Sequence, residues 1–274
     1  MKAVGIIPAR WASTRFPGKA LHPIAGKPLL QHVWERCCQA RSLASVIIAT
    51  DDMRIAEAAF AWGAEVALTS SRHQSGTDRV AEVAHKAPEF THIINIQGDE
   101  PLTDPKLLDR LVREMAKDST IEMITAAHPF ADAADVASPH QVKVVRAQNG
   151  DALYFSRAPI PVSRNDGFQA AKGLAADTPG RRGSRPSLHL RHQGIYGYTR
   201  ETLLRFVAWK PSPLERAEFL EQLRALENGV RIRVLVTGSG SPGVDTPADA
   251  EAVARELVRL ARKKVPPKRK KKAR

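Results

Sequence analysis

The first half of the chain alternates short apolar runs rich in Val and Ile with longer stretches in which apolar residues recur every three or four positions. Runs of the first kind are typical of buried strands, and stretches of the second kind are typical of amphipathic helices. Their alternation predicts an α/β fold with a mostly parallel sheet and crossover helices. The predicted strands are 4–7, 46–49, 65–68 and 92–96, and the predicted helices are 28–41, 53–62, 77–86 and 105–117.

The pattern changes near Met123, where strands with longer, proline-containing connections begin. We expect a smaller mixed lobe there, and a surface loop at 165–186, which is rich in Gly, Ala, Arg and Asp without periodicity. We therefore expect one domain, 1–261. It consists of a first part (about 1–122), the lobe (about 123–230) and a closing strand and helix (231–261). The later predicted strands are 142–145, 153–156, 195–198 and 231–236, and the later helices are 214–227 and 247–263.

Charge changes this picture only at the C-terminus. The net charge is +13, but nine Lys and Arg residues and no acid lie within 262–274, so the rest of the chain carries +4. Such a run cannot bury enough apolar surface to fold alone, and we expect a disordered basic tail. Nonspecific contacts of the tail with RNA, DNA or anionic membrane are conceivable, and a passive tail is favoured over them.

Composition indicates a globular protein that stays in the cytoplasm. Apolar residues make up 43% and charged residues 26% of the chain, and no segment has the roughly 18 uninterrupted apolar residues of a transmembrane span. Pro8 and Arg10 interrupt the first apolar run before the core of a signal peptide could form. Cys37 and Cys38 are adjacent, which disfavours a disulfide between them, and no Cys/His cluster with the spacing of a zinc site is present.

The strongest chemical signal follows the first predicted strand, in residues 8–19 (PARWASTRFPGK). Three cations, two hydroxyls and Gly18 in so short a turn suit a polyphosphate, because guanidinium groups and Lys19 bind phosphate oxygens and glycine permits close backbone approach. The segment is not a Walker A loop, which requires glycine at Ser13 and Ser or Thr at Ala20. A basic surface loop is the alternative.

Two further signals are carboxylates that follow or precede predicted elements. Asp99 comes directly after an apolar strand, where a parallel sheet presents residues to ligands, and Asp245 precedes the last helix. Together they could hold Mg²⁺ and assist nucleotidyl transfer. Helix capping is the competing role, which suits Asp104 before Pro105 better than it suits Asp99, and which stays open for Asp245 beside Thr246 and Pro247.

These motifs, in this order, resemble the 3-deoxy-manno-octulosonate cytidylyltransferase (CMP-Kdo synthetase) family, over nearly everything from residue 2 to about 257. The resemblance implies a fold of the nucleotide-diphospho-sugar transferase type, a homodimer, and transfer of CMP from CTP to the acid sugar Kdo for lipopolysaccharide biosynthesis. Residues 1–122 would then bind the nucleotide and 123–230 the sugar and the second subunit. The motifs include IIPARWASTRFPGK (6–19), GKPLLQHV (26–33), HQSGTDR (73–79), NIQGDEPL (95–102), ALYFSRAPIP (152–161), RHQGIYGY (191–198) and GVDTPAD (243–249).

The resemblance also implies roles for individual residues. The nucleotide would be bound by Ala9, Arg10, Ser13, Arg15, Lys19, Ser75, Gly76, Thr77 and Arg79. The sugar would be bound by Gln97, Arg157, Arg164, His192, Tyr196, Glu221 and Gln222. Arg10, Lys19, Asp99 and Asp245 would be catalytic, the two aspartates as Mg²⁺ ligands. Pattern alone would assign the sugar-side residues ordinary roles: solvated arginines, a core histidine, a packed tyrosine and an exposed helix face.

Two other functions stay open from the sequence. The 8-amino analogue of Kdo, and less readily a sialic acid, could be the acceptor, because the 165–186 segment adjoins the expected sugar site and departs from the family pattern. A nucleic-acid-binding module would fit the basic tail and the pI of about 10.1. The interior offers no aromatic-interleaved RNA signature, so the enzyme is favoured.

Overall fold

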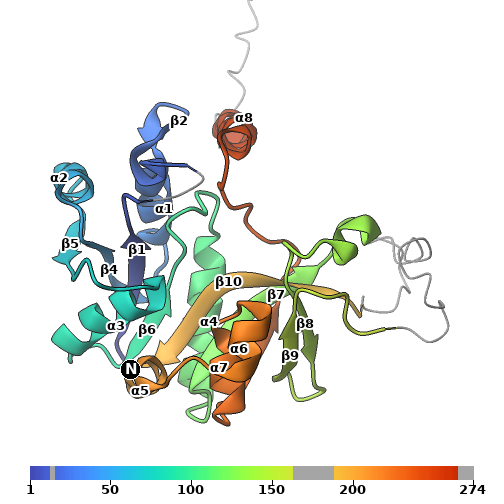
Figure 1. Ribbon diagram of the computed structural model, residues 1–274. Helices are drawn as coiled ribbons and strands as arrows, with labels where there is room; N and C mark the ends of the chain where they lie inside the picture. The colour runs from blue at the N-terminus through green and yellow to red at the C-terminus, as the bar shows by residue number, and fades with distance from the viewer. Residues whose placement is uncertain (13–15, 163–187, 265–274) are drawn as a thin grey trace, which may run out of the picture.

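The computed structural model describes residues 1–12, 16–162 and 188–264 of the chain. Its main sheet has nine strands in the described residues, with the path β11-β7-β10-β6-β1-β4-β5 and with β8 and β9 branching from β10 (Figure 1). A two-stranded ribbon lies apart from it, formed by β2 (Pro23–Ile24) and β3 (Lys27–Pro28).

The four strands predicted in the first half all form and are parallel to one another. They are β1 (Ala3–Ala9), β4 (Leu43–Thr50), β5 (Glu65–Leu68) and β6 (His92–Asn95). Strand β1 lies at the centre, between β4 and β6, and is buried along nearly its whole length. Strands covered on both faces read as continuous apolar runs, which is why the sequence reveals them.

Helices cover both faces of this sheet, because successive strand residues point to opposite sides. On one side Ile7 and Ile94 pack with Leu30 and Leu108; on the other, Ile6 packs with the second group of helices. The first group comprises α1 (Leu29–Cys37), α2 (Met53–Ala61) and α4 (Pro105–Lys117). The second group comprises α3 (Gly76–Lys86), α5 (Arg200–Ala208) and α7 (Gln222–Glu227). The α/β fold class is therefore confirmed.

Strand β10 (Leu190–Thr199) runs antiparallel between β6 and β7 (Met123–Pro129). Strand β7 pairs in turn with β11 (Ile232–Val236), parallel to it. The region after Met123 thus extends the first sheet rather than building a sheet of its own. Only β8 (Lys143–Arg146) and β9 (Ala152–Ser156), a hairpin attached to the start of β10, leave the main path, after the short 3₁₀ turn η2 (Ala133–Ala137).

The predicted helix 214–227 is wrong in one respect: it is two helices, α6 (Pro213–Glu218) and α7. Phe219 lies between them with φ of 52°, a left-handed conformation that ends a helix. A buried ion pair joins the two helices, with Arg224 Nε donating to Glu215 Oε2 at 2.8 Å. The resulting corner brings Glu221 to the start of α7, and α5 is a further helix that the pattern did not predict.

Helix α8 (Pro247–Lys264) ends the described chain and confirms the predicted closing helix. Ala250 and Val253 pack with Ile24 and Leu29, so α8 docks on the β2–β3 ribbon and the start of α1 (Figure 1). The helix includes 262–264, so the predicted tail begins later than expected; 265–274 and the predicted loop 165–186 lie outside the described residues.

Both cysteines are free; Cys37 is buried and Cys38 is exposed. Among the described residues no helix is long and apolar enough to cross a membrane.

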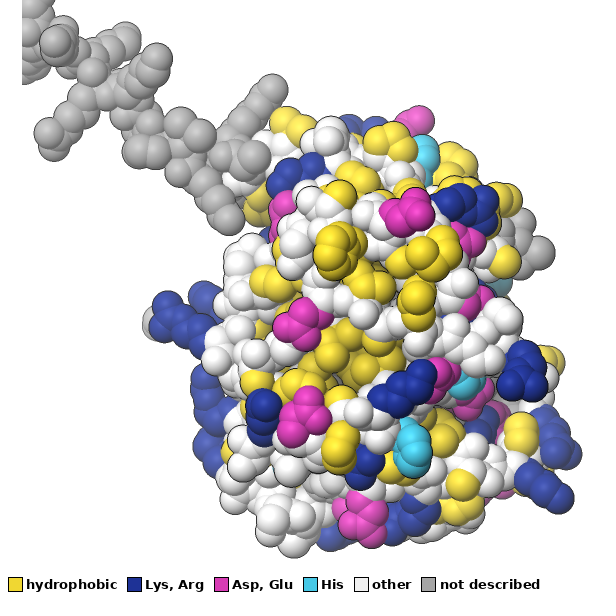
Figure 2. Space-filling view, turned by 90° about the vertical axis from the view of Figure 1, so that its left-hand side faces the viewer, with side chains coloured by type: hydrophobic (Ala, Val, Ile, Leu, Met, Phe, Trp, Pro, Cys, Tyr) yellow, Lys and Arg dark blue, Asp and Glu magenta, His cyan; other side chains and the backbone are white. Residues whose placement is uncertain are grey.

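Strand β5 is one edge of the sheet, and Figure 2 shows this side of the molecule. Hydrophobic side chains gather near the centre of this face, with Lys and Arg around them. Large apolar side chains exposed on α2 and β5 include Met53, Phe60 and Leu68. The edge strand is only four residues long and begins with a glutamate, features that limit pairing with other chains.

The place of β10 between its neighbours predicts the effect of a substitution at Gly197. A Cβ atom there would lie 2.6 Å from Ile124 Cγ2 and 3.0 Å from Met115 Sδ. We expect Gly197→Ala to lower the free energy of unfolding by about 1–3 kcal/mol through overpacking, measured by urea denaturation. Gly238→Ala is the control, because a Cβ there has no neighbour within 4 Å. Equal stability of the two variants would contradict the packing described for β10.

Candidate active site

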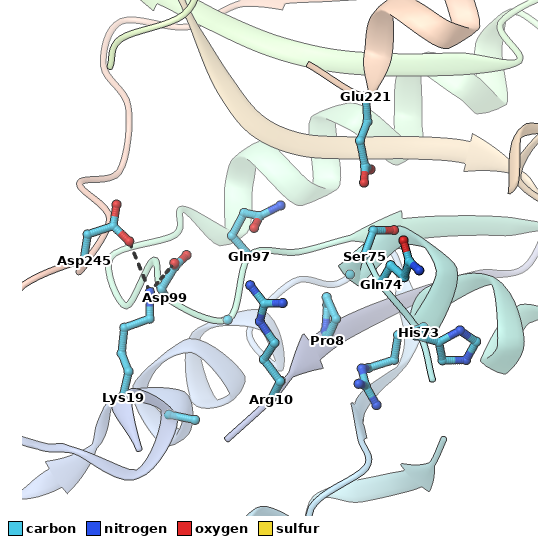
Figure 3. Close-up of a pocket in the computed structure, with 15 residues that line it drawn as sticks. Pro8, Arg10, Lys19, His73, Gln74, Ser75, Gln97, Asp99, Glu221 and Asp245 are labelled. Atoms are coloured by element: carbon cyan, nitrogen blue, oxygen red, sulfur yellow. Dashed lines mark hydrogen bonds and ion pairs between the residues drawn. The ribbon is translucent and has the colours of Figure 1, made fainter. Parts of the chain in front are cut away.

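A pocket of about 500 Å³ opens at the carboxyl ends of β1 and β6 (Figure 3). Parallel strands bring their carboxyl ends to one edge, so segments distant in sequence meet there. We call this cavity the first pocket. It is lined by Pro8, Ala9 and Arg10 after β1; Lys19 and Ala20; His73, Gln74, Ser75, Gly76 and Arg79 around the start of α3; Gln97, Gly98 and Asp99 after β6; and Glu221 and Asp245.

Lys19 lies between the two aspartates that the sequence singled out. Its Nζ is 2.7 Å from Asp99 Oδ2 and 3.3 Å from Asp245 Oδ1 (Figure 3). The backbone brings the two acids together, since Val244 N donates to Asp99 O at 2.9 Å and the Val244 side chain is fully buried. Two carboxylates thus converge on one cation at the wall of the pocket.

Thr246 and Asp249 cap the start of helix α8. The amides of Asp245 and Thr246 donate to Asp249 Oδ2, at 3.1 and 2.8 Å, and Asp249 N donates to the Thr246 hydroxyl at 3.2 Å. Thr246 and Asp249 thus cap the start of the helix, and the Asp245 carboxylate faces Lys19; its role as a metal ligand stays a prediction. Asp104 does cap α4, as predicted.

The basic loop is held at both of its described ends. Trp11 O accepts from Gly18 N at 3.3 Å, and Gly18, with φ of 68°, lies so close to the Trp11 ring that a Cβ would be 3.2 Å away. The Arg54 guanidinium stacks on the Trp11 ring, with its central carbon 3.6 Å from the ring centroid, and pairs with Asp52. This cation–π contact and the glycine fix the residues that flank Arg10 and Lys19. Ser13 and Arg15 lie outside the described residues.

The start of α3 forms the opposite wall of the first pocket. Ser75 caps the helix in a capping box with Asp78, and Gly76 lies against Pro8, where a Cβ would be 3.3 Å from the ring. The helix N-terminus carries a partial positive charge that favours anions and polar groups. Arg79 is 4% exposed and pairs with Asp51 at 3.0 Å, so its guanidinium is already engaged.

A second pocket of about 400 Å³ adjoins the first and shares Gln97 and Glu221 with it. Gln97 Nε2 donates to Gly194 O at 2.7 Å, and the Thr77 hydroxyl donates to Glu221 Oε2 at 2.7 Å, so both shared side chains are fixed. The second pocket is lined by Thr77, Asn95, Gln97, His192, Gly194, Tyr196, Tyr198, Phe219, Leu220, Glu221 and Gln222.

Most of the predicted sugar-side residues lie together in the structure. Of the predicted sugar-side residues, Gln97, His192, Tyr196, Glu221 and Gln222 all line the second pocket. Thr77, predicted for the nucleotide, lines the second pocket and not the first. Asn95, Tyr198 and the first-pocket residues His73 and Gln74 were not predicted; the polar Asn95 inside an apolar strand was the available signal.

His192 is a neutral histidine in the second pocket. Its Nε2 is 3.1 Å from the Thr125 hydroxyl, which itself donates to Ile195 O at 2.7 Å. Because the hydroxyl proton goes to that carbonyl, the oxygen accepts from Nε2–H, and Nδ1 is left as the ring's acceptor. Burial lowers the pKa of His192 to about 3.

Arg157 does not line either pocket. Its guanidinium donates to the carbonyl oxygens of Glu218 at 2.7 Å, Pro139 at 3.0 Å and Phe219 at 3.3 Å. The arginine therefore fixes the corner between α6 and α7, beside the second pocket. Its predicted contact with the sugar stays a prediction, and Arg164 lies outside the described residues.

The fold and the paired pockets are typical of a nucleotidyltransferase: one pocket carries cations and a helix N-terminus, and the other carries polar groups. The chain belongs to the cytidylyltransferase family, whose model matches residues 4–232.

Individual relatives agree. Proteins named 3-deoxy-manno-octulosonate cytidylyltransferase are 49% identical in Geobacter metallireducens, over 95% of this chain and 99% of that protein, and 48% identical in Geotalea uraniireducens, over 94% and 99%. A solved structure of CMP:2-keto-3-deoxy-manno-octonic acid synthetase complexed with CTP is similar at a TM-score of 0.85 with 42% identity, covering 95% of this chain and 100% of that one.

The low pKa of His192 predicts an acid sensitivity. Between pH 6.5 and about 3 the unfolded histidine binds a proton that the folded one does not, so stability is lost as the pH falls through this window. In His192→Gln we expect the free energy of unfolding to fall less steeply as the pH is lowered. The difference in slope from the wild type should be up to about 1.4 kcal/mol per pH unit, measured by urea denaturation between pH 7 and 4. His85→Gln, at an exposed position, is the control. Parallel curves for wild type and His192→Gln would contradict a buried neutral imidazole.

Proposed function

We propose that the chain transfers CMP from CTP to Kdo, giving CMP-Kdo and pyrophosphate for lipopolysaccharide biosynthesis. The observation that carries this proposal is the junction of the two pockets at Gln97 and Glu221, with cations on one side of it and polar groups on the other. The names of the relatives support CTP and Kdo as the two substrates. No feature of the described residues favours 8-amino-Kdo.

CTP would occupy the first pocket. Arg10, which points into it, and Lys19 would bind phosphate oxygens, while Ser75 and Gly76 at the start of α3 would contact the cytidine (Figure 3). Kdo would occupy the second pocket, where His192 Nδ1, Gln222 and Glu221 offer acceptors and donors to its hydroxyl groups.

We also propose Mg²⁺ as the cofactor. The fit rests on the chemistry of the donors: Asp99 and Asp245 converge on one point that Lys19 Nζ now shares, and carboxylates are preferred Mg²⁺ ligands. The described residues contain no group of three or more His, Cys, Asp or Glu at metal-binding geometry, so further ligands would come from phosphates and water, as is usual for Mg²⁺. Bound there, the ion would stabilise charge on the phosphates.

The reaction would be an in-line displacement. The anomeric hydroxyl oxygen of Kdo forms a bond to the α-phosphorus of CTP, the bond from that phosphorus to the bridging oxygen of pyrophosphate breaks, and the hydroxyl proton is released. Lys19 and Arg10 would offset the negative charge that develops on the leaving pyrophosphate. Most of the catalysis is then positioning and electrostatics, with the two substrates held on either side of Gln97 and Glu221.

The function is tested by measuring pyrophosphate release from each nucleoside triphosphate with Kdo, 8-amino-Kdo and sialic acid, with and without Mg²⁺. Release only with CTP, Kdo and Mg²⁺ is expected. Faster release with 8-amino-Kdo would change the acceptor, and no release with any combination would contradict the enzyme. The homodimer and the anionic contacts of the tail stay predictions, to be checked by light scattering and by salt-dependent RNA binding.

Asp99 provides the sharpest test of the metal. Asp99→Asn keeps the side chain's size but removes a charge from the pair around Lys19, so we expect turnover to fall by about 100-fold or more with little change in melting temperature. Asp104→Asn, five residues away, is the matched control, because asparagine caps a helix as well as aspartate. Near-normal CMP-Kdo formation by Asp99→Asn would rule out the metal assignment.

A further inference from the structure

Asn95 is a polar residue at a core position of strand β6. Along this strand Ile94 and Ile96 face the α1 and α4 side of the sheet, and Ile93 faces the α3 and α5 side. Side chains alternate along a strand, so Asn95 shares the side of Ile93, where the pattern calls for an apolar residue. Tyr196 lies directly opposite it on β10. The asparagine therefore sits in the floor of the second pocket.

The side-chain carbonyl oxygen of Asn95 is buried without a partner among the described residues. The residue is 3% exposed, and its Oδ1 has no hydrogen bond to any described residue. Gln222, on the other wall of the same pocket, is 6% exposed and its Nε2 is also unpaired within the described chain. Buried polar atoms are almost always hydrogen-bonded, because leaving one unpaired is unfavourable. Two unpaired atoms, Asn95 Oδ1 and Gln222 Nε2, on residues that line one pocket indicate a ligand that supplies the missing partners.

The surroundings indicate which chemistry that ligand has. The Tyr196 hydroxyl, buried in the same pocket, also makes no hydrogen bond of normal geometry there, although Thr125 is close. Amides and a phenol pair with neutral groups that both donate and accept, and hydroxyl groups do both. Asn95 lines only the second pocket, so such a ligand would be the acceptor and not the nucleotide.

We propose that Asn95 binds a hydroxyl group of the acceptor sugar through its side-chain amide and so contributes to acceptor specificity. This inference rests on the proposed function, because it assigns the second pocket to Kdo. It adds a residue of β6 itself to a pocket whose other walls come from β10, the α6–α7 corner, the start of α3 and the turn after β6. The hydroxyl of the sugar completes the hydrogen bonding of an amide that the fold leaves unpaired.

The test is Asn95→Leu, which keeps the size of the side chain and removes its polar atoms. We expect the KM for Kdo to rise 10-fold or more while the KM for CTP changes less than twofold. The melting temperature of the ligand-free variant should equal or exceed that of the wild type, because an unpaired buried amide is removed. Asn95→Ser gives the same kinetic comparison should leucine impair folding.

The matched control is Asn149→Leu. Both polar atoms of the Asn149 side chain have partners: Oδ1 accepts from Asp151 N and Nδ2 donates to Asp151 Oδ2, both at 3.0 Å, and Asn149 lines neither pocket. This variant should show the opposite signature, with a lower melting temperature and unchanged KM values. The two asparagines thereby separate a ligand-binding role from a structural one.

Kdo analogues that each lack one hydroxyl identify the partner of Asn95. The loss caused by Asn95→Leu should disappear with one analogue and persist with the others, as in a double-mutant cycle. An unchanged KM for Kdo, or a lower melting temperature with unchanged kinetics, would overturn the proposal. Wild-type turnover with Kdo is the separate check on the proposed function: its absence would remove the function, whereas normal turnover in Asn95→Leu would remove only the role of Asn95.

Discussion

The antiparallel pairing of β10 with β6 is the constraint on which the rest of the site depends. Four backbone pairs, from Tyr196 opposite Asn95 to Thr199 opposite His92, fix the register. The earlier residues of β10 therefore run past the carboxyl end of β6, where Gly194 O meets Gln97. A one-residue slip would turn Tyr196 away from the pocket, because neighbouring side chains point to opposite faces. The pairing of β10 with β6 thus places the second pocket directly beside the first.

A second coupling joins the two ends of the chain. Lys19 near the N-terminus meets Asp245 before the last helix, and the Val244–Asp99 backbone bond holds both beside β6. The three charges are only partly buried, so their mutual attraction contributes little to stability. Their convergence supports the proposed magnesium site, in which a metal ion would lie between the two carboxylates.

The sequence predicted what local pattern and charge encode. Buried parallel strands read as apolar runs, so β1 and β6 were predicted. The concentration of cations after β1 singled out Arg10 and Lys19, which line the first pocket. The partners of β10 were not predicted, because alternation along a strand does not say which strand it pairs with. The break at Phe219 had no signal, since phenylalanine rarely adopts positive φ. Asn95 was not predicted as a site residue because it was counted within an apolar strand. The contacts of Arg157 were not predicted because its carbonyl partners come from distant segments that only the fold brings together.

In the proposed reaction CTP and Kdo lie on either side of Gln97 and Glu221 and react directly. The stereochemistry at the α-phosphorus tests this claim most directly. A single diastereomer of CTP with sulfur on the α-phosphate can be converted with Kdo, and the configuration of the product followed by phosphorus NMR. One in-line displacement predicts inversion at phosphorus. Retention would mean two displacements through a covalent enzyme intermediate, and would contradict direct transfer between adjoining pockets.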